Sequence, residues 1–295
     1  MLGPPAATAA PTSSPASGSR SSSLLSAACD QYDDAAPYSS VRRYKTLTLT
    51  NSIQVLLVSD RTALQASAAV TVNGAGQFSD PSYLHGLAHL MEHIVLSSTA
   101  GGGSWSNQGD FREWIDGDYA EGFSNGFTAY EKVCFHFSCG TDAFGEALQR
   151  FSNLLLDKVV SRTCQNPVAV QREILRVNSE LDKANLFSRE LYLTKSLINP
   201  RHPYSKVTPG SLESLKTVPE IVGINVPKEL CKFYQERYRA DQAILAVVSP
   251  ASLADLEKMV QPFAATLLRR TDTLLPPSEQ PPPTPSRFCR CCCVF

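Results

Sequence analysis

The sequence predicts an α+β fold, a single sandwich domain in which an antiparallel β-sheet packs against helices, flanked by a disordered N-terminal segment and a Pro-rich C-terminal segment. Two observations predict it. β-prone apolar stretches come first along the chain, amphipathic helical patterns follow them, and one more β-prone stretch comes late, an order typical of strands that pair as an antiparallel sheet. In addition, 43% of the 295 residues are hydrophobic, which is enough to build a sizeable core.

Composition sets the limits of the folded part. Residues 1–40 are rich in Ala, Ser, Pro and Thr and hold no acidic residue before Asp30, so they bury too little apolar area to offset chain entropy. Such a leader also resembles an organellar transit peptide, although Arg20 is its single basic residue. Residues 271–295 form a Pro-rich linker and a Cys-rich tail, which leaves residues 41–270 as the expected folded domain.

The strand predictions rest on alternating polar and apolar residues and on β-branched runs. The first two strands are joined by a turn at Asn51-Ser52 and form a hairpin, and the third ends at Asn73-Gly74. The expected strands cover residues 45–50, 53–58, 66–72, 127–138 and 243–248.

The helix predictions rest on apolar residues at helical spacing. Residues 86–96 carry such a stripe, and residues 142–156 form an amphipathic helix with an aromatic and aliphatic face. A long helical pattern covers residues 166–198 and begins at Asn166, a suitable cap before Pro167. The stretch 101–119 is Gly-, Ser- and Asp-containing, and we expect an irregular insertion with one helix at its end.

Charge and cysteine usage narrow the class of protein. With 27 basic and 28 acidic residues the formal net charge is −1, so nothing indicates a nucleic-acid partner or a broadly basic membrane-binding face. No apolar run reaches the roughly 18–20 residues of a membrane-spanning helix. The nine cysteines show no disulfide framework, which favours reduced thiols in a soluble cytoplasmic protein.

One predicted helix carries chemistry. His85, His89 and His93 recur every four residues and Glu92 precedes the last of them, so His89 and His93 share a face and both imidazoles can reach one metal ion. The pattern His-x-x-Glu-His is the inverted zincin motif, in which the glutamate is the catalytic base. The alternative is that the two histidines are ordinary core or surface residues, and His85 is expected to be structural.

A catalytic zinc site needs a third protein ligand that leaves one position open to water. Glu173 and Glu180 are the best candidates, because they lie two turns apart on the long predicted helix and therefore share a face beside an apolar stripe. The alternative is a pair of solvated surface carboxylates.

Four segments, taken in order along the chain, carry a family resemblance. They are 44–60, which looks like an opening hairpin; Gly86-Leu87-Ala88-His89-Leu90-Met91-Glu92-His93; Ser124-Asn125-Gly126-Phe127-Thr128; and Asn199-Pro200-Arg201-His202-Pro203-Tyr204-Ser205-Lys206. Through them the chain from about residue 44 to residue 268 resembles the amino-terminal catalytic domain of the pitrilysin and insulin-degrading-enzyme metallopeptidases.

The resemblance implies an activity and a set of site residues. It implies a zinc metalloendopeptidase that holds one Zn²⁺ per chain, with Glu92 as the base and peptides as substrates. It places Glu180 beside His89 and His93 as the third ligand and Glu173 in a supporting position. Three residues would bind the peptide by strand addition: Asn125, Gly126 and Phe127.

The chain departs from the family pattern in two ways. The interval from His93 to Glu180 is longer than the family leads us to expect, and the stretch 101–107 accounts for part of the excess. The family encloses its substrate between several such domains, whereas this chain has one. A second family domain or self-association would complete the chamber. The alternatives to an active enzyme are a non-catalytic binding partner and an incomplete fragment of a larger enzyme.

The C-terminal residues 292–295 fit a prenylation box, which would bring the chain to a membrane. The other two interpretations are an artificial or truncated end and a thiol cluster with metal or redox chemistry.

Overall fold

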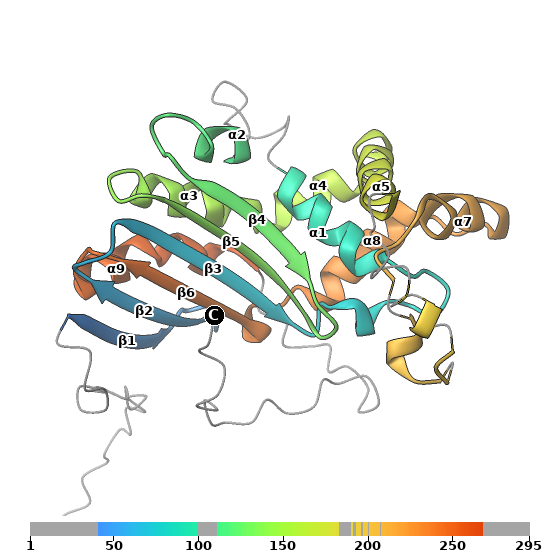
Figure 1. The fold of residues 1–295 in the computed structure, drawn as a ribbon, viewed down its shortest axis with the longest axis horizontal. Helices are drawn as coiled ribbons and strands as arrows, with labels where there is room; N and C mark the ends of the chain where they lie inside the picture. The colour runs from blue at the N-terminus through green and yellow to red at the C-terminus, as the bar shows by residue number, and fades with distance from the viewer. Residues whose placement is uncertain are drawn as a thin grey trace, which may run out of the picture.

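The computed structural model describes residues 41–98, 111–182, 190, 193–195, 197–199, 201–206 and 208–267. Its centre is a six-stranded sheet with the order β1-β2-β6-β3-β5-β4, and helices cover one side and one end of it (Figure 1). The strands are β1 (Arg42–Thr48), β2 (Gln54–Asp60), β3 (Gln65–Asn73), β4 (Phe123–Thr128), β5 (Lys132–Gly140) and β6 (Ala243–Ser249).

The sheet is mixed within the predicted α+β class. Four of its five strand pairings are antiparallel, and β2 with β6 is parallel. The parallel pair has a topological cause. Because β2 and β3 run in opposite directions and β6 lies between them, β6 must run parallel to one of its neighbours.

Helices α1, α4, α5, α7 and α8 gather at one end of the sheet, while α3 and α9 lie behind it (Figure 1). The helices are α1 (Leu87–Ser97), α2 (Phe111–Ile115), α3 (Phe144–Leu154), α4 (Asp157–Cys164), α5 (Pro167–Asp182), α7 (Val218–Val222), α8 (Val226–Arg237) and α9 (Leu253–Met259). Short turns of helix are η1 (Gln77–Ser79), η2 (Pro203–Lys206), η3 (Glu213–Thr217), η4 (Ala240–Gln242) and η5 (Gln261–Ala265). Within the described ranges, no helix combines the length and the apolar character that a membrane span requires.

One prediction is wrong, and another can be compared with the structure only in part. The single strand expected over 127–138 is wrong, because β4 and β5 are two strands of a hairpin in which Ala129 N donates to Lys132 O at 2.8 Å. The turn lacks Gly and Pro, so the sequence gives no break signal there. Helix α5 ends at Asp182, and part of the helix expected to residue 198 lies outside the described residues. The predicted leader, the tail and most of the insertion also lie outside them.

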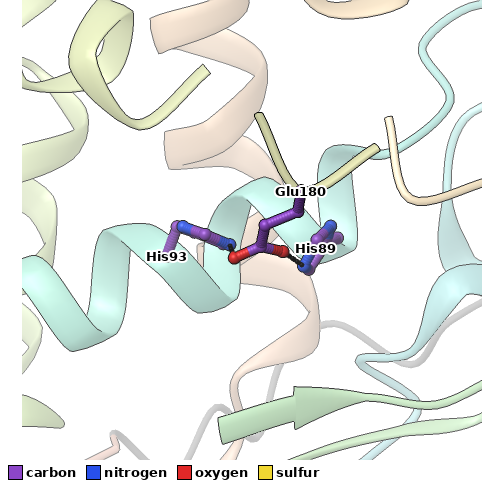
Figure 2. A group of neighbouring side chains, drawn as sticks. All are labelled: His89, His93 and Glu180. Atoms are coloured by element: carbon purple, nitrogen blue, oxygen red, sulfur yellow. Dashed lines mark ion pairs between the residues drawn. The ribbon is translucent and has the colours of Figure 1, made fainter. Parts of the chain in front are cut away.

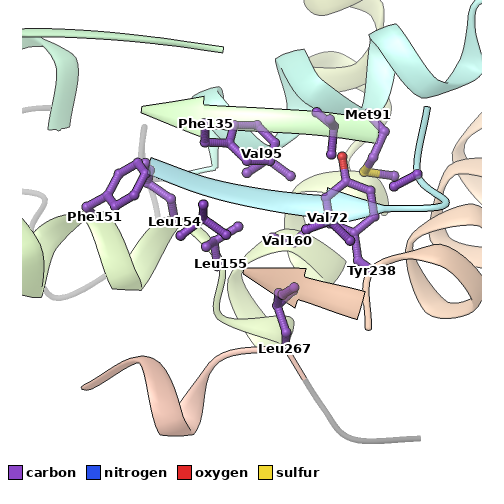
Figure 3. Close-up of a cluster of buried hydrophobic side chains, with 14 of the residues drawn as sticks. Val72, Met91, Val95, Phe135, Phe151, Leu154, Leu155, Val160, Tyr238 and Leu267 are labelled. Atoms are coloured by element: carbon purple, nitrogen blue, oxygen red, sulfur yellow. The ribbon is translucent and has the colours of Figure 1, made fainter. Parts of the chain in front are cut away.

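The core lies between the sheet and the helices (Figure 3). Val72 of β3 and Phe135 of β5 are fully buried on the sheet side, and Met91 and Val95 of α1 are fully buried opposite them. In this core, the Tyr238 hydroxyl is the one buried side-chain polar atom among the described residues that lacks a hydrogen-bond partner. Burial raises the pKa of Tyr238 well above its ordinary value, so the hydroxyl stays neutral.

We expect Tyr238→Phe to be neutral or to raise the free energy of unfolding by about 1–3 kcal/mol, because it removes a buried hydroxyl that has lost its bonds to water. Urea denaturation of both proteins measures the difference. Tyr234→Phe is the matched control: its hydroxyl donates to Leu155 O at 3.4 Å, and its loss should destabilise the fold. A clear destabilisation by Tyr238→Phe would show instead that the hydroxyl holds a buried water.

Candidate metal centre

Helix α1 is anchored at its N-terminus by a carboxylate from the segment just before it. The helix begins after Gly86, whose φ of 89° is a left-handed conformation that favours glycine. Asp80 is buried and accepts hydrogen bonds from Gly86 N and Ala88 N, both at 2.7 Å. These bonds satisfy two of the free N–H groups of the first turn, and the negative charge is favourable at that end of the helix. The cap therefore fixes where α1 starts and how its histidines are presented.

Helices α1 and α5 bring the two predicted histidines and Glu180 together (Figure 2). The rings of His89 and His93 lie one helical turn apart, with centroids 4.9 Å from each other. Glu180 on α5 lies between them: its Oε2 is 3.4 Å from His89 Nε2 and its Oε1 is 3.6 Å from His93 Nε2. Thus both imidazoles present the same ring nitrogen to one carboxylate.

The three side chains fit a metal ion by type and by spacing. One ligand atom from each lies within 4.8 Å of the others. Ligands at about 2.0–2.1 Å from a tetrahedral zinc lie about 3.3–3.4 Å from one another, close to the two distances that join Glu180 to the histidines. Two imidazoles and one carboxylate are a known catalytic zinc set, which leaves one position for water. The donor group does not include His85.

Each histidine has a further contact on its other ring nitrogen. The Nδ1 atom of His89 lies 2.7 Å from Pro209 O, and as the donor there it leaves Nε2 free to bind a metal. The Nδ1 atom of His93 lies 3.7 Å from Glu173 Oε2. Such outer contacts fix the ring orientation of a metal-ligating histidine.

Glu173 is buried among positive groups. It is 1% exposed, and its carboxylate accepts from Arg172 Nε at 3.0 Å and from Arg176 Nη1 at 3.1 Å. Burial alone would raise the pKa of Glu173, but the bond with His93 and the two guanidinium groups outweigh it and lower that pKa. Glu173 therefore stays ionised, as an orienting partner of His93 should.

The electrostatics of the ligand group also favour the ionised carboxylate. The hydrogen bond with His89 lowers the pKa of Glu180 despite partial burial. Burial would lower the pKa of His89, but the bond with Glu180 and the charge of Glu92 raise it overall. A cation is thus favoured at the place where these groups meet.

Glu92 lies next to His93 on α1 and faces strand β4. It is 5% exposed, and Thr128 Oγ1 donates to its Oε2 at 2.6 Å. Burial raises the pKa of Glu92, and the Thr128 bond only partly opposes this. A carboxylate whose pKa is raised toward neutrality is a better proton acceptor, which is the property a general base needs.

Gly126 of β4 packs directly against Glu92. A Cβ atom built at Gly126 would lie 2.9 Å from Glu92 Oε1, so a side chain there would displace the carboxylate. The neighbouring residues Asn125 and Phe127 are exposed on the other face of the strand, Phe127 by 48%. Strand β4 pairs only with β5 and forms an edge of the described sheet, so its outer side offers main-chain groups to an added strand.

The sequence reasoning missed three contacts of this site. Asp80 caps α1 from eight positions before Ala88, Pro209 holds His89 from a distant loop, and Thr128 bonds Glu92. Thr128 belongs to one of the four segments that carry the family resemblance, but the resemblance implied no role for it. Gly86 and Gly210 also approach each other closely, because a Cβ atom built at Gly86 would lie 2.3 Å from the Cα atom of Gly210. The sequence shows only that both residues are glycine.

Comparisons with known proteins agree with one another. Residues 54–199 match the family described as Insulinase (Peptidase family M16). The chain is 34% identical over 228 residues to the Arabidopsis thaliana protein "Insulin-degrading enzyme-like 1, peroxisomal", covering 76% of this chain and 22% of that protein. It is 34% identical over 221 residues to the Homo sapiens insulin-degrading enzyme, covering 74% and 21%.

Solved structures show the same fold. The crystal structure of pitrilysin matches with a TM-score of 0.67 and 28% identity over 83% of this chain and 25% of that one. A structure described as a peptidase M16 inactive domain from Pseudomonas fluorescens matches with a TM-score of 0.61 at 17% identity, covering 77% and 52%, and supports the fold alone. The chain spans about a fifth of the length of the insulin-degrading enzymes it matches.

Proposed function

Because the chain belongs to the insulinase family of peptidases, we propose that it is a zinc-dependent metalloendopeptidase that hydrolyses extended peptides. The observation that carries the proposal is the position of buried Glu92 beside three metal donors, His89, His93 and Glu180. A protein that only binds has no chemical need to keep a buried carboxylate of raised pKa next to such a group.

In the proposed mechanism, His89, His93 and Glu180 would hold one zinc ion, whose chemistry when bound would be to acidify water and to polarise a peptide carbonyl. Glu92 accepts the proton of the attacking water and then gives it to the leaving amine. The hydroxyl of Thr128 fixes the Glu92 carboxylate through Oε2 and leaves Oε1 for that proton. Pro209 and Glu173 keep the two imidazoles oriented.

The peptide would lie along β4. Its main chain would pair with the outer side of Asn125, Gly126 and Phe127, which would bring a peptide carbonyl beside Glu92 because Gly126 contacts that carboxylate. Selection would rest on the extended backbone, with Phe127 offering an exposed apolar surface to one substrate side chain.

A second candidate is a binding protein or an incomplete enzyme. The observation that favours it is the coverage: this chain matches about a fifth of the length of its relatives, which are therefore much longer than the matched part. We propose that a second family domain or another copy of this chain completes the active assembly. We also propose a cytoplasmic location, where the free thiols of Cys134, Cys139, Cys164 and Cys231 would stay reduced.

The test is cleavage of a quenched fluorescent peptide by the purified full chain. We expect activity with zinc, loss after treatment with a chelator and recovery when zinc is added back. Zinc binding without any cleavage would support the incomplete-enzyme alternative, and cleavage that survives the chelator would contradict the zinc mechanism.

We expect Gly126→Ala to lower kcat without loss of bound zinc, because the new methyl group meets Glu92 Oε1 and moves the base. A loss of about tenfold or more fits the sensitivity of catalysis to misplacement by 1 Å. Steady-state kinetics and zinc content measure the two effects.

Gly145→Ala on α3 is the matched control, since nothing lies within 4 Å of a Cβ there and alanine favours the helix. It should keep wild-type kinetics. Equal kinetics for Gly126→Ala and the wild type would contradict the placement of Glu92.

A further inference from the structure

A lysine outside the metal centre lies in an aromatic enclosure. Lys195 is 4% exposed, and its ammonium group lies 5.4 Å from the ring centroid of Tyr130 and 4.9 Å from that of Tyr204. The two rings are 5.1 Å apart at an interplanar angle of 74°, and their hydroxyl groups are joined at 3.3 Å. We call Lys195, Tyr130 and Tyr204 the lysine clamp. It connects the turn after β4 to the region that holds Lys195 and Tyr204, which is distant from that turn in the sequence.

One arm of the clamp is the hairpin turn that ends strand β4. Tyr130 lies two residues after Thr128, the partner of Glu92, and its ring stacks on Phe78 with centroids 5.5 Å apart. The Phe78 amide donates to Tyr130 O at 2.8 Å. Tyr130 therefore ties the turn at the C-terminal end of β4 to η1.

The other arm leads to a metal donor. Tyr204 lies in η2, five positions before Pro209, whose carbonyl contacts His89 Nδ1. Gly210 follows at once and packs against Gly86 at the start of α1. Because only five positions separate Tyr204 from Pro209, we expect a shift of η2 to disturb the contact that orients His89.

We propose that Lys195 is a positioning residue that holds the substrate strand β4 in register with the metal centre through Tyr130 and Tyr204. A cation held between two aromatic faces and shielded from water is strongly attracted to both, so one ammonium group can join two loops that share no strand pairing. The inference rests on the proposed function, because register matters only if β4 carries the peptide.

The test compares Lys195→Met and Lys195→Arg with the wild type as full, zinc-loaded chains. Methionine keeps the length and apolar stem without the charge, whereas arginine keeps a cation that stacks on aromatic rings. For Lys195→Met we expect kcat to fall by about ten- to a hundredfold with KM nearly unchanged. The peptide still pairs with β4, but its carbonyl is displaced from the metal centre. Lys195→Arg should recover most of the loss.

Hydrogen exchange makes the test independent of activity. In Lys195→Met, amides of residues 129–131, 204–206, 208 and 210 should exchange faster, while those of β3 and β6 keep their protection. The control is Lys258→Met, at an exposed lysine on α9 paired with Asp255, which should change neither exchange nor kinetics.

Unchanged exchange in both segments would overturn the clamp, even if the chain proves inactive. Faster exchange confined to these two segments, in a chain that cleaves no peptide, would support the clamp and refute the proposed function. Equal loss of kcat in the methionine and arginine variants would reduce Lys195 to a packing residue.

Discussion

Glu92→Gln is expected to leave zinc bound and to lower peptide cleavage by about 10²–10⁴-fold, the range typical of a lost general base. Glutamine has nearly the same shape, and its amide oxygen can still accept the Thr128 hydrogen bond, so the packing against Gly126 should persist. It cannot take a proton from water. Steady-state kinetics with a quenched fluorescent peptide and zinc content of the same sample measure the two quantities.

The control for Glu92→Gln is Thr128→Val, which removes the hydrogen bond but keeps the carboxylate. We expect it to lose less activity than Glu92→Gln and to shift the acid limb of the pH–rate profile upward, because the Thr128 bond lowers the pKa of Glu92. The base must be ionised to act, so activity would be lost at a higher pH as the medium is acidified. Full cleavage by Glu92→Gln would contradict the assignment of the base.

We expect Glu180→Gln to weaken zinc binding. The loss should exceed the factor of about 10–100 that is typical when a partner of a metal ligand is removed. Among the residues that the structure describes, Glu180 alone spans both histidines, with its two oxygens 3.4 and 3.6 Å from their Nε2 atoms, and the amide removes its charge. Cleavage should fall in proportion to the zinc lost and return in part at high zinc concentration. Competition with a chromophoric chelator gives the affinity.

Glu220→Gln on α7 is the matched control, because Glu220 is an exposed carboxylate outside the donor group. It should bind zinc as the wild type does. If Glu180→Gln keeps wild-type zinc affinity, then Glu180 is a surface carboxylate and another residue completes the centre.

The local parts of this molecule could be predicted from its sequence. Apolar spacing gave helix α1, and a four-residue interval placed His89 and His93 on one face of it. The two-turn interval between Glu173 and Glu180 likewise put both carboxylates toward α1. These inferences succeed because helical geometry alone decides which residues share a face.

The long-range parts could not be predicted in that way. The contact of Pro209 with His89 depends on how loops pack, and no spacing rule connects residues 120 positions apart. The cap from Asp80 is closer in sequence, but it depends on the path of the irregular segment before α1. The parallel pairing of β2 with β6 follows from where a late strand inserts into the sheet. The β4–β5 hairpin was missed because its turn, Ala129-Tyr130-Glu131, carries none of the usual turn residues.

The family resemblance supplied what periodicity could not. Within residues 166–198 spacing singled out Glu173 and Glu180, but it left open whether either reaches the histidines or faces solvent. The structure now brings Glu180 to both Nε2 atoms and Glu173 to Nδ1 of His93, which supports different tasks for the two. Both assignments are proposals, and the zinc measurements above test that of Glu180.

The most direct test of the central claim is the zinc content of the purified full chain, measured by mass spectrometry of the metal beside the Glu180→Gln and Glu92→Gln variants. We predict about one zinc per chain in the wild type and in Glu92→Gln, and a clear deficit in Glu180→Gln. A wild-type chain that takes up no zinc at neutral pH would contradict the claim that His89, His93 and Glu180 form a metal centre.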